Sequence, residues 1–203
     1  MKKQFEEIYS ENKWLYGSGE GSQPQHTRPY AAFLQNFLRQ NKIKSVVDMG
    51  CGDWQFSQFI DWKGIEYQGF DVVASVVEAN QKKFSSPAIR FQLAAGDGSD
   101  LPSANLLIAK DVLQHWSNDA VMTFLPNLKK YDYCLLTNCV NPNGKTTNEN
   151  IENGGFRYLD LRLPPFAIQA EELLSFTNNR GTIGTFFSKP RWLKKVLLVR
   201  NQK

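Results

Sequence analysis

The chain has 203 residues, a formal net charge of +4, and 41% hydrophobic against 22% charged residues. This composition is typical of a soluble globular protein, and the length suits one domain with a sizeable core, so we expect a single domain over residues 1–203. No apolar run approaches the roughly 20 residues that span a bilayer, which excludes a membrane partner. The small positive charge indicates no nucleic-acid groove, and no DNA partner is expected.

The N-terminus and the cysteines indicate the cellular compartment. The two lysines near the start are not followed by an apolar segment, so no signal peptide is expected. Cys51, Cys134 and Cys139 are odd in number and lack CxxC spacing, which argues against a disulfide framework and against a zinc site. We therefore expect a cytoplasmic protein without a bound metal.

The elements expected from hydrophobic periodicity alternate between helices and strands. A loop rich in Gly, Ser and Pro is expected over residues 16–30. Helices are expected at 30–42, 54–60, 74–84 and 118–131, the last of them kinked or shortened by Pro126. Strands are expected at 43–49, 65–71, 88–94, 105–111, 131–138, 171–177 and 192–200, with an irregular segment at 139–166 and a glycine-rich one at 178–185. This alternation favours an α/β fold whose sheet is covered on both faces.

Aspartates stand at or just after the ends of the first four expected strands. Asp48, Asp71 and Asp111 end strands, and Asp97 follows the third strand within a few residues. A single aspartate at such a place often caps a helix. Because α/β sheets bind ligands at the carboxyl ends of their strands, four of them along one edge indicate a binding site.

The stretch SVVDMGCGDWQF places a glycine turn directly after the first of these strands. Gly50 and Gly52 permit positive φ and a close approach of the backbone to a ligand. The helix expected next would point its N-terminal N–H groups at that ligand. Gln55 stands where the dinucleotide motif G-x-G-x-x-G requires its third glycine, which argues against NAD.

Asp71 follows Asp48 by 23 residues, at the end of the second expected strand. An acidic residue at this place accepts hydrogen bonds from both hydroxyls of a ribose. Together with the short glycine turn, it predicts a nucleoside ligand without a pyrophosphate.

The blocks VVDMGCGDW, GFD, GDGSDLP and LLIAKDVLQHW, within residues 43–138, resemble the successive motifs of class I S-adenosylmethionine-dependent methyltransferases. The stretches YGSGEGS, KDVLQHWSN and GGFRYLDLRLPPF resemble a small bacterial-type subgroup whose substrates are mostly unassigned. The resemblance implies S-adenosyl-L-methionine as cofactor and a Rossmann-like, seven-stranded, mostly parallel sheet with the last strand antiparallel. It divides the domain into an N-terminal lid and helix (1–40), a cofactor-binding core (41–138) and a substrate-side segment with closing strands (139–203).

The resemblance also implies a set of cofactor-binding residues along the strand ends. They are Asp48, Gly50 and Gly52 at the methionine part, Asp71 and Val72 at the ribose and adenine, Asp97 and Gly98 at the adenine amino group, and Lys110 with Asp111 at the sulfonium side and the substrate. Trp54 departs from the wider family, which has smaller residues there, and is expected to pack over the cofactor.

Catalysis of methyl transfer requires alignment of the nucleophile, methyl group and sulfur, and in some cases removal of a proton from the nucleophile. His115, four residues past Asp111, is the candidate base, and Asp111 is the alternative. A histidine that caps or packs the helix start beside Trp116 is equally consistent with the sequence.

Three polar segments have two interpretations each. Residues 16–22 form either a linker or a lid, with Thr27, Arg28 and Tyr30 contributing polar contacts and Arg28 meeting the cofactor carboxylate. Residues 154–166 form either a surface crossover or a wall of the substrate pocket, with candidate substrate contacts at Arg157, Tyr158 and Arg162. The basic segment KPRWLKK at 189–195 is expected on a solvated face or, alternatively, at a polymer substrate, and His26 is expected to be solvated.

The sequence therefore predicts a methyltransferase that acts on a small molecule or a saccharide by in-line transfer. A protein or RNA methyltransferase is the alternative within enzymes, and strong salt dependence of binding would favour it. A non-catalytic nucleoside-binding or scaffold protein is the alternative from another class. The acceptor atom and the oligomeric state stay open.

Overall fold

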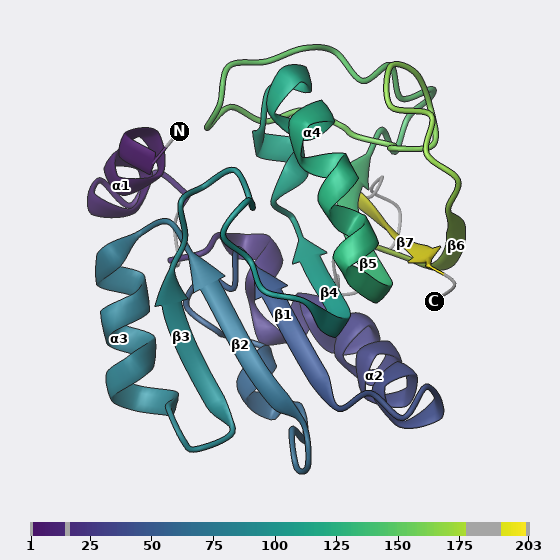
Figure 1. Ribbon diagram of the computed structural model, residues 1–203. Helices are drawn as coiled ribbons and strands as arrows, with labels where there is room; N and C mark the ends of the chain where they lie inside the picture. The colour runs from purple at the N-terminus through teal and green to yellow at the C-terminus, as the bar shows by residue number, and fades with distance from the viewer. Residues whose placement is uncertain (1, 15–16, 178–191, 202–203) are drawn as a thin grey trace, which may run out of the picture.

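The computed structural model describes residues 2–14, 17–177 and 192–201. Tyr16, the glycine-rich segment 178–185 and residues 189–191 of the basic segment lie outside these ranges. Figure 1 shows a twisted sheet with helices on both of its faces. None of the helices among the described residues has the length and apolarity that a membrane span requires.

Seven strands form one sheet in the order β3-β2-β1-β4-β5-β7-β6. The strands are β1 (Ser45–Met49), β2 (Glu66–Asp71), β3 (Ile89–Leu93), β4 (Ala104–Lys110), β5 (Tyr131–Val140), β6 (Glu171–Thr177) and β7 (Leu193–Arg200). Strands β1 to β5 pair in parallel, whereas β7 is antiparallel to both β5 and β6. The predicted fold class, a mostly parallel sheet with its last strand antiparallel, is confirmed. The strand order reverses between β1 and β4, which places a ligand crevice at the carboxyl ends of these two strands.

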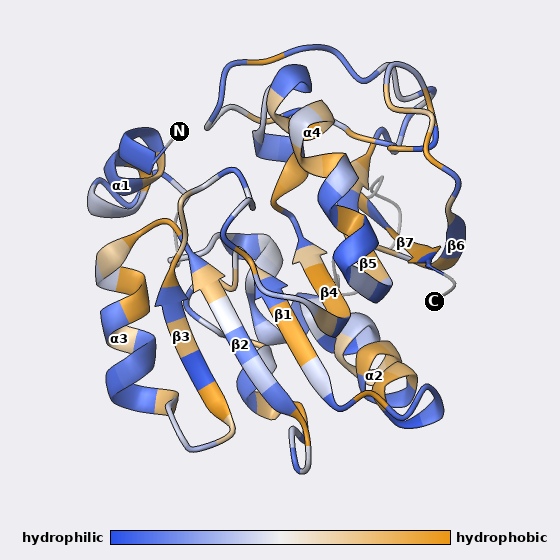
Figure 2. Ribbon diagram, in the orientation of Figure 1, coloured by the Kyte–Doolittle hydropathy of each residue, from blue (hydrophilic) through white to orange (hydrophobic). Residues whose placement is uncertain are grey.

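The helices pack against the two faces of the sheet and form two cores. The helices are α1 (Lys2–Ser10), α2 (Pro24–Gln40), α3 (Ala74–Phe84) and α4 (Asn118–Phe124), with 3₁₀ turns at Glu20–Ser22, Ser57–Phe59, Leu113–His115 and Leu125–Lys130. One core joins residues of α1 and α4 to one face, and the other joins α2 to the opposite face. Figure 2 shows the consequence in the strands: central β4 is mostly hydrophobic, whereas β3 at the sheet edge is mixed.

The helix expected at 54–60 was wrong, because only a 3₁₀ turn at Ser57–Phe59 forms there. Trp54 adopts φ of +57° and is buried, with its ring centroid 5.5 Å from that of Tyr67 and 5.4 Å from that of Phe91. This aromatic packing holds the chain against the sheet in a conformation that a helix cannot continue. The glycine turn is therefore not followed by a helix N-terminus whose N–H groups could meet a ligand.

Helix α2 begins at Pro24, six residues earlier than expected, with a proline in its first turn. Thr27, Arg28 and Tyr30 therefore lie on a helix and not in a loop. The prediction that His26 is solvated is also wrong, since this residue is only 8% exposed and packs against Trp192. In contrast, the shortening of the fourth helix at Pro126 is confirmed, because the chain changes to a 3₁₀ turn at Leu125.

Candidate active site

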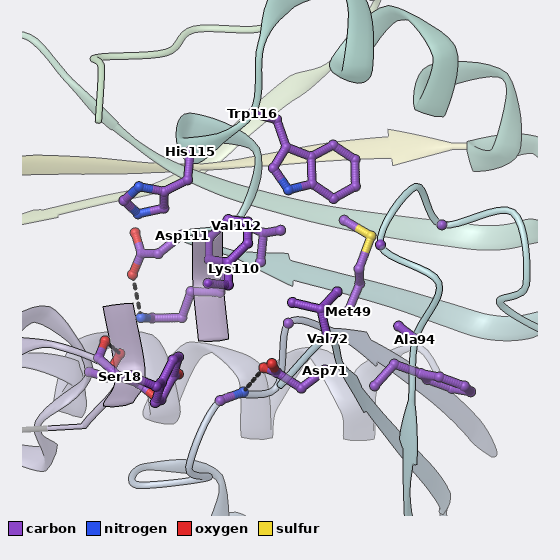
Figure 3. Close-up of a pocket in the computed structure, with 18 of the residues that line it drawn as sticks. Ser18, Met49, Asp71, Val72, Ala94, Lys110, Asp111, Val112, His115 and Trp116 are labelled. Carbon is purple, nitrogen blue, oxygen red and sulfur yellow. Dashed lines mark hydrogen bonds and ion pairs between the residues drawn. The ribbon is translucent and has the colours of Figure 1, made fainter. Parts of the chain in front are cut away.

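A pocket lies at the strand-order reversal, at the carboxyl ends of β1, β2 and β4 (Figure 3). We call it the inner pocket; it is lined by Gly50, Gly52, Asp71, Val72, Gly98, Lys110, Asp111, His115 and residues of the N-terminal segment. The space inside it, together with the open solvent at its mouth, is about 710 Å³.

The glycine turn after β1 forms the floor of the inner pocket. The N–H groups of Gly50 and Cys51 both donate to the carbonyl of Phe70, at 2.8 and 3.0 Å, which ties the turn to the end of β2. Gly50 has φ of +69° and Gly52 has φ of +55°, a conformation that favours glycine. A Cβ atom on Gly50 would also overlap with Cγ2 of Val112.

Asp71 is buried at the end of β2, with its carboxylate at the inner pocket. Its Oδ2 accepts the N–H of Gly52 at 3.0 Å, and its Oδ1 accepts the N–H of Val73 at 3.1 Å. These backbone hydrogen bonds lower the pKa of Asp71, but burial has the larger effect and raises it to about 6. Because a carboxylate offers about four acceptor sites, some of this capacity is left for a ligand.

Asp111 is the centre of a buried ion cluster at the end of β4. Lys110 donates to its Oδ2 at 2.6 Å, and Lys194 of β7 donates to the same oxygen. Burial alone would raise the pKa of Asp111, but the two ammonium groups lower it to about 2. Asp111 is therefore ionised at neutral pH. Its φ of +61° is an uncommon conformation outside glycine, and its N–H is fixed by the carbonyl of Thr137 at 2.8 Å.

Lys194 contradicts the expectation that the basic segment decorates a solvated face. Its side chain is 3% exposed, forms the ion pair with Asp111 and lies 3.4 Å from the carbonyl oxygen of Gly21. The strand period contains the signal that was missed, because Lys194 shares its face of β7 with the buried residues Val196 and Leu198.

His115 lies above Asp111, and one carboxylate oxygen of Asp111 points towards its ring (Figure 3). Its Nδ1 is 2.6 Å from the carbonyl oxygen of Gly155, and since a carbonyl only accepts, Nδ1 carries the proton. Burial lowers the pKa of His115 below its ordinary 6.5, so the ring is neutral at neutral pH. Its Nε2 is then the acceptor nitrogen, and the side-chain amide of Gln114 donates to it at a long 3.4 Å.

The N-terminal segment covers the glycine turn. The hydroxyls of Tyr9 and Ser18 are 2.8 Å apart, and Ser18 Oγ accepts the N–H of Asp53 at 2.9 Å. Phe5, Tyr9, Trp14 and Ser18 line the inner pocket. This position fits the lid interpretation, but its contacts come from α1 and the residues after it.

The remaining predicted cofactor residues lie around the pocket. Asp48 is buried below it and accepts the Tyr67 hydroxyl at 2.5 Å, while burial raises its pKa to about 7. Asp97 is exposed, and hydrogen bonds from Ser99 lower its pKa. Neither Asp97 nor the predicted residues of α2 line the inner pocket. Thr27 is buried and donates to a backbone carbonyl at the start of its own helix, and Arg28 is exposed. Tyr30 lies in the core below Lys110.

A second hollow, which we call the outer pocket, adjoins the inner one. It has an empty volume of about 590 Å³, and both pockets are lined by Trp14, Ser18, Ser22, Asp111 and His115. Its other lining residues include Gln114, Phe156, Trp192 and Lys194. The sequence did not indicate Trp14 or Phe156, because aromatic residues in irregular segments have no period that assigns them to a face. Trp192 was expected only as the first residue of a strand.

The predicted substrate contacts Arg157, Tyr158 and Arg162 do not line either pocket. Arg157 donates to the backbone carbonyls of Glu149 and Trp116 at 2.7 and 2.9 Å, and Arg162 pairs with Asp160 at 2.7 Å. Arg157 therefore fixes the crossover segment in place, and the neighbouring Phe156 is the residue that reaches the outer pocket.

A family model described as an O-methyltransferase domain matches residues 5–149. Solved structures share the fold. One is the magnesium protoporphyrin IX methyltransferase from Synechocystis PCC 6803 with bound SAH, at 14% identity over 100% of both chains and a TM-score of 0.67. Another is the 1,6-didemethyltoxoflavin-N1-methyltransferase from Burkholderia thailandensis, at 15% identity, 99% of this chain, 87% of the other and a TM-score of 0.67. A search of curated proteins finds no match.

The human N-acetylserotonin methyltransferase in complex with SAM is also similar in fold. The two chains are 16% identical, with a TM-score of 0.55, and the match covers 86% of this chain and 55% of the human one. At these identities the solved structures establish the fold, and the family model establishes the relationship.

The overlap at Gly50 predicts a stability loss beyond that of backbone strain. Gly50→Ala should lower the free energy of unfolding by about 1–2 kcal/mol for the left-handed conformation and by about 1–3 kcal/mol more for overpacking against Val112. Gly64→Ala is the matched control, since Gly64 has φ of +74° and a Cβ atom added there would meet nothing within 4 Å. Urea denaturation measures both variants, and equal losses would contradict the role assigned to Val112.

Proposed function

The chain belongs to the O-methyltransferase domain family, and we propose that it methylates a small molecule held in the outer pocket. The predicted class I S-adenosylmethionine-dependent methyltransferase is confirmed by this membership and by the fold. The observation that carries the proposal is the pair of adjoining pockets with Asp111 and His115 on their common boundary. One pocket suits a nucleoside, the other suits a second molecule, and the transfer takes place between them.

The residues of the inner pocket fit S-adenosyl-L-methionine. Asp71 has acceptor capacity left for the ribose hydroxyls, and Val72 and Gly98 offer apolar and open surface beside it. Lys110 lies at the far end, where it also lines a small hollow with Asp48, Gly50 and Gly52. An ammonium in that place would meet the carboxylate of the cofactor's methionine part.

When bound, the cofactor supplies an electrophilic methyl group: the acceptor atom forms the new bond to carbon, and the sulfur keeps the electrons of the broken bond. The chain's own task is to align the acceptor and to take its proton. His115 suits the second task, because its ring is neutral and its Nε2 carries the lone pair, which accepts only a long hydrogen bond of 3.4 Å from Gln114. Asp111 suits it poorly, since a carboxylate with a pKa of about 2 is a weak base.

The outer pocket supports a small acceptor over a polymer. Trp14, Phe156 and Trp192 provide flat apolar surfaces around one charged corner. Of the basic segment, Lys194 is only 3% exposed in the corner of the outer pocket, and Lys195 pairs with Glu172 at 2.9 Å. Neither lysine is therefore placed to dock a phosphate backbone. Incubation with S-adenosyl-L-methionine and a panel of small aromatic hydroxyl and amine compounds, read out as S-adenosylhomocysteine release, tests the proposal. Turnover only with RNA or protein would contradict it.

The contact proposed for Asp71 predicts both an affinity loss and a pH dependence. Asp71→Ala should weaken binding of S-adenosylhomocysteine by about 1.5–3 kcal/mol, the contribution of a hydrogen bond to a charged group. The ionised carboxylate is the better acceptor, so affinity of the unaltered protein should fall as the pH drops through about 6, the pKa of Asp71. Calorimetry measures both effects.

Glu66→Ala is the matched control, because it removes an exposed carboxylate from the opposite end of the same strand. It should leave the affinity and its pH dependence unchanged. An Asp71→Ala protein that binds S-adenosylhomocysteine normally would refute the ribose contact.

The assignment of His115 as the base predicts a selective loss of turnover. His115→Ala should lower the rate by roughly 10²–10⁴-fold and leave S-adenosylhomocysteine affinity nearly unchanged. In the unaltered protein the rate should rise with pH through a pKa below 6.5, because burial lowers the pKa of His115. The measurement is the pH–rate profile with the best acceptor from the panel.

His26→Ala serves as the comparison, since His26 is the second of the two histidines, is buried and lines neither pocket. It should lower the melting temperature and spare the rate per folded molecule. The same pattern in His115→Ala would mean that His115 is structural.

A further inference from the structure

We propose that Lys194 is a specificity-determining residue that selects flat aromatic acceptors carrying an oxyanion, a carboxylate above all, in the outer pocket. The inference rests on the proposed function and deepens it by naming the acceptor class. It follows from the charge balance of the Asp111 cluster, the unused hydrogen-bonding capacity of its members and the shape of the pocket around them.

The charges of the cluster do not cancel at the outer pocket. One carboxylate oxygen, Oδ2 of Asp111, is shared by two buried ammonium groups, those of Lys110 and Lys194. The other nearby carboxyl, Asp48, interacts with Lys110 and lines only the small hollow on that side. Among the described residues that line the outer pocket, Lys194 is thus the only cationic side chain, since His115 is neutral. A buried ammonium that shares its carboxylate with a second ammonium is only partly neutralised, which costs free energy. An anion beside Lys194 would complete the neutralisation.

Lys194 also has a donor left for that anion. An ammonium has three N–H groups, and its acceptors among the described residues are Asp111 Oδ2 and, at a long 3.4 Å, the carbonyl of Gly21. The ammonium lies 4.7 Å from the ring centroid of Trp192, at the wall of the outer pocket. A carboxylate on a ring that packs against these aromatic side chains would lie within reach of it.

The second oxygen of Asp111 adds a requirement for a hydrogen-bond donor. Oδ1 is buried without a hydrogen-bond partner in the described part of the chain, and it points towards His115 (Figure 3). A buried carboxylate oxygen without a hydrogen-bond partner favours the binding of a ligand that donates an O–H or N–H to it. The corner therefore offers an acceptor, Asp111 Oδ1, beside a donor, Lys194 Nζ. This pair is complementary to a hydroxy acid, in which the hydroxyl lies next to the carboxylate.

The test compares two probes of nearly the same shape, the anionic 3-hydroxy-2-naphthoate and the neutral 3-hydroxy-2-naphthamide. Calorimetry measures their binding to the full chain saturated with S-adenosylhomocysteine. The naphthoate should bind about tenfold or more tightly than the amide, as a charge-assisted hydrogen bond implies. Lys194→Met should reduce this preference to less than about twofold, and Lys194→Arg should retain most of it.

Lys195→Met is the matched control, because it removes the same charge from the next residue of β7, which pairs with Glu172 outside both pockets. It should keep the full preference. Equal binding of the two probes to the unaltered protein, no binding of either, or an unchanged preference in Lys194→Met would each overturn the inference.

A second measurement needs no variant and covers the case in which Lys194→Met does not fold. In protein labelled with ¹³C at lysine, the naphthoate should shift the Cε signal of Lys194 and the amide should not, and identical responses would overturn the inference. S-adenosylhomocysteine binding separates the two levels of the account. A chain that binds it but shows no charge preference refutes only the role of Lys194, whereas a chain that does not bind it refutes the proposed function.

Discussion

The carboxylate of Asp111, shared by two buried lysines, is the interaction on which the arrangement of the site depends. Lys110 holds it from the end of β4, and Lys194 holds it from β7, at the other side of β5. Lys194 in turn contacts the carbonyl of Gly21 in the N-terminal segment. Three parts of the chain that are distant in sequence thus meet at one charge. Removing Asp111 would leave the two buried ammonium groups without their shared partner, and breaking a buried ion pair in this way costs about 3–5 kcal/mol.

Asp48, Asp71 and Asp111, which lie at the carboxyl ends of the strands, differ in pKa because their partners differ. Burial raises the pKa of Asp48 to about 7 and that of Asp71 to about 6, whereas the two lysines lower the pKa of Asp111 to about 2. The pKa values of Asp48 and Asp71 lie above the ordinary value of 3.8. These two carboxyls therefore stabilise the ligand-free fold at low pH, and this contribution is lost as the pH rises through 6 to 7. Asp111 acts in the opposite sense, since its contribution is present above 3.8 and is lost as pH falls through about 2. A ligand that donates hydrogen bonds to Asp71 would offset its burial, so the site is prepared for an occupant.

The sequence was sufficient for the sheet and for much of the inner pocket, and insufficient for the rest of the site. Strand ends and positive-φ glycines are local features, so Gly50, Gly52, Asp71 and Asp111 could be identified as pocket residues before the structure. The failed helix after the glycine turn depended on the packing of Trp54 against Tyr67 and Phe91, which are distant in sequence. Lys194 escaped notice because its partner lies 83 residues away, and a lysine near a chain end resembles a solvated one.

The central claim is that the cofactor binds at the carboxyl ends of β1, β2 and β4. The most direct test is titration of ¹⁵N-labelled protein with S-adenosylhomocysteine, followed by amide chemical shifts. The account predicts the largest shifts at Gly50, Gly52 and Val73, whose N–H groups are bonded to the end of β2 or to Asp71. Shifts confined to the hollow at the opposite edge of the sheet, around Ile43, Asn105 and Arg200, or no shifts at all, would contradict it.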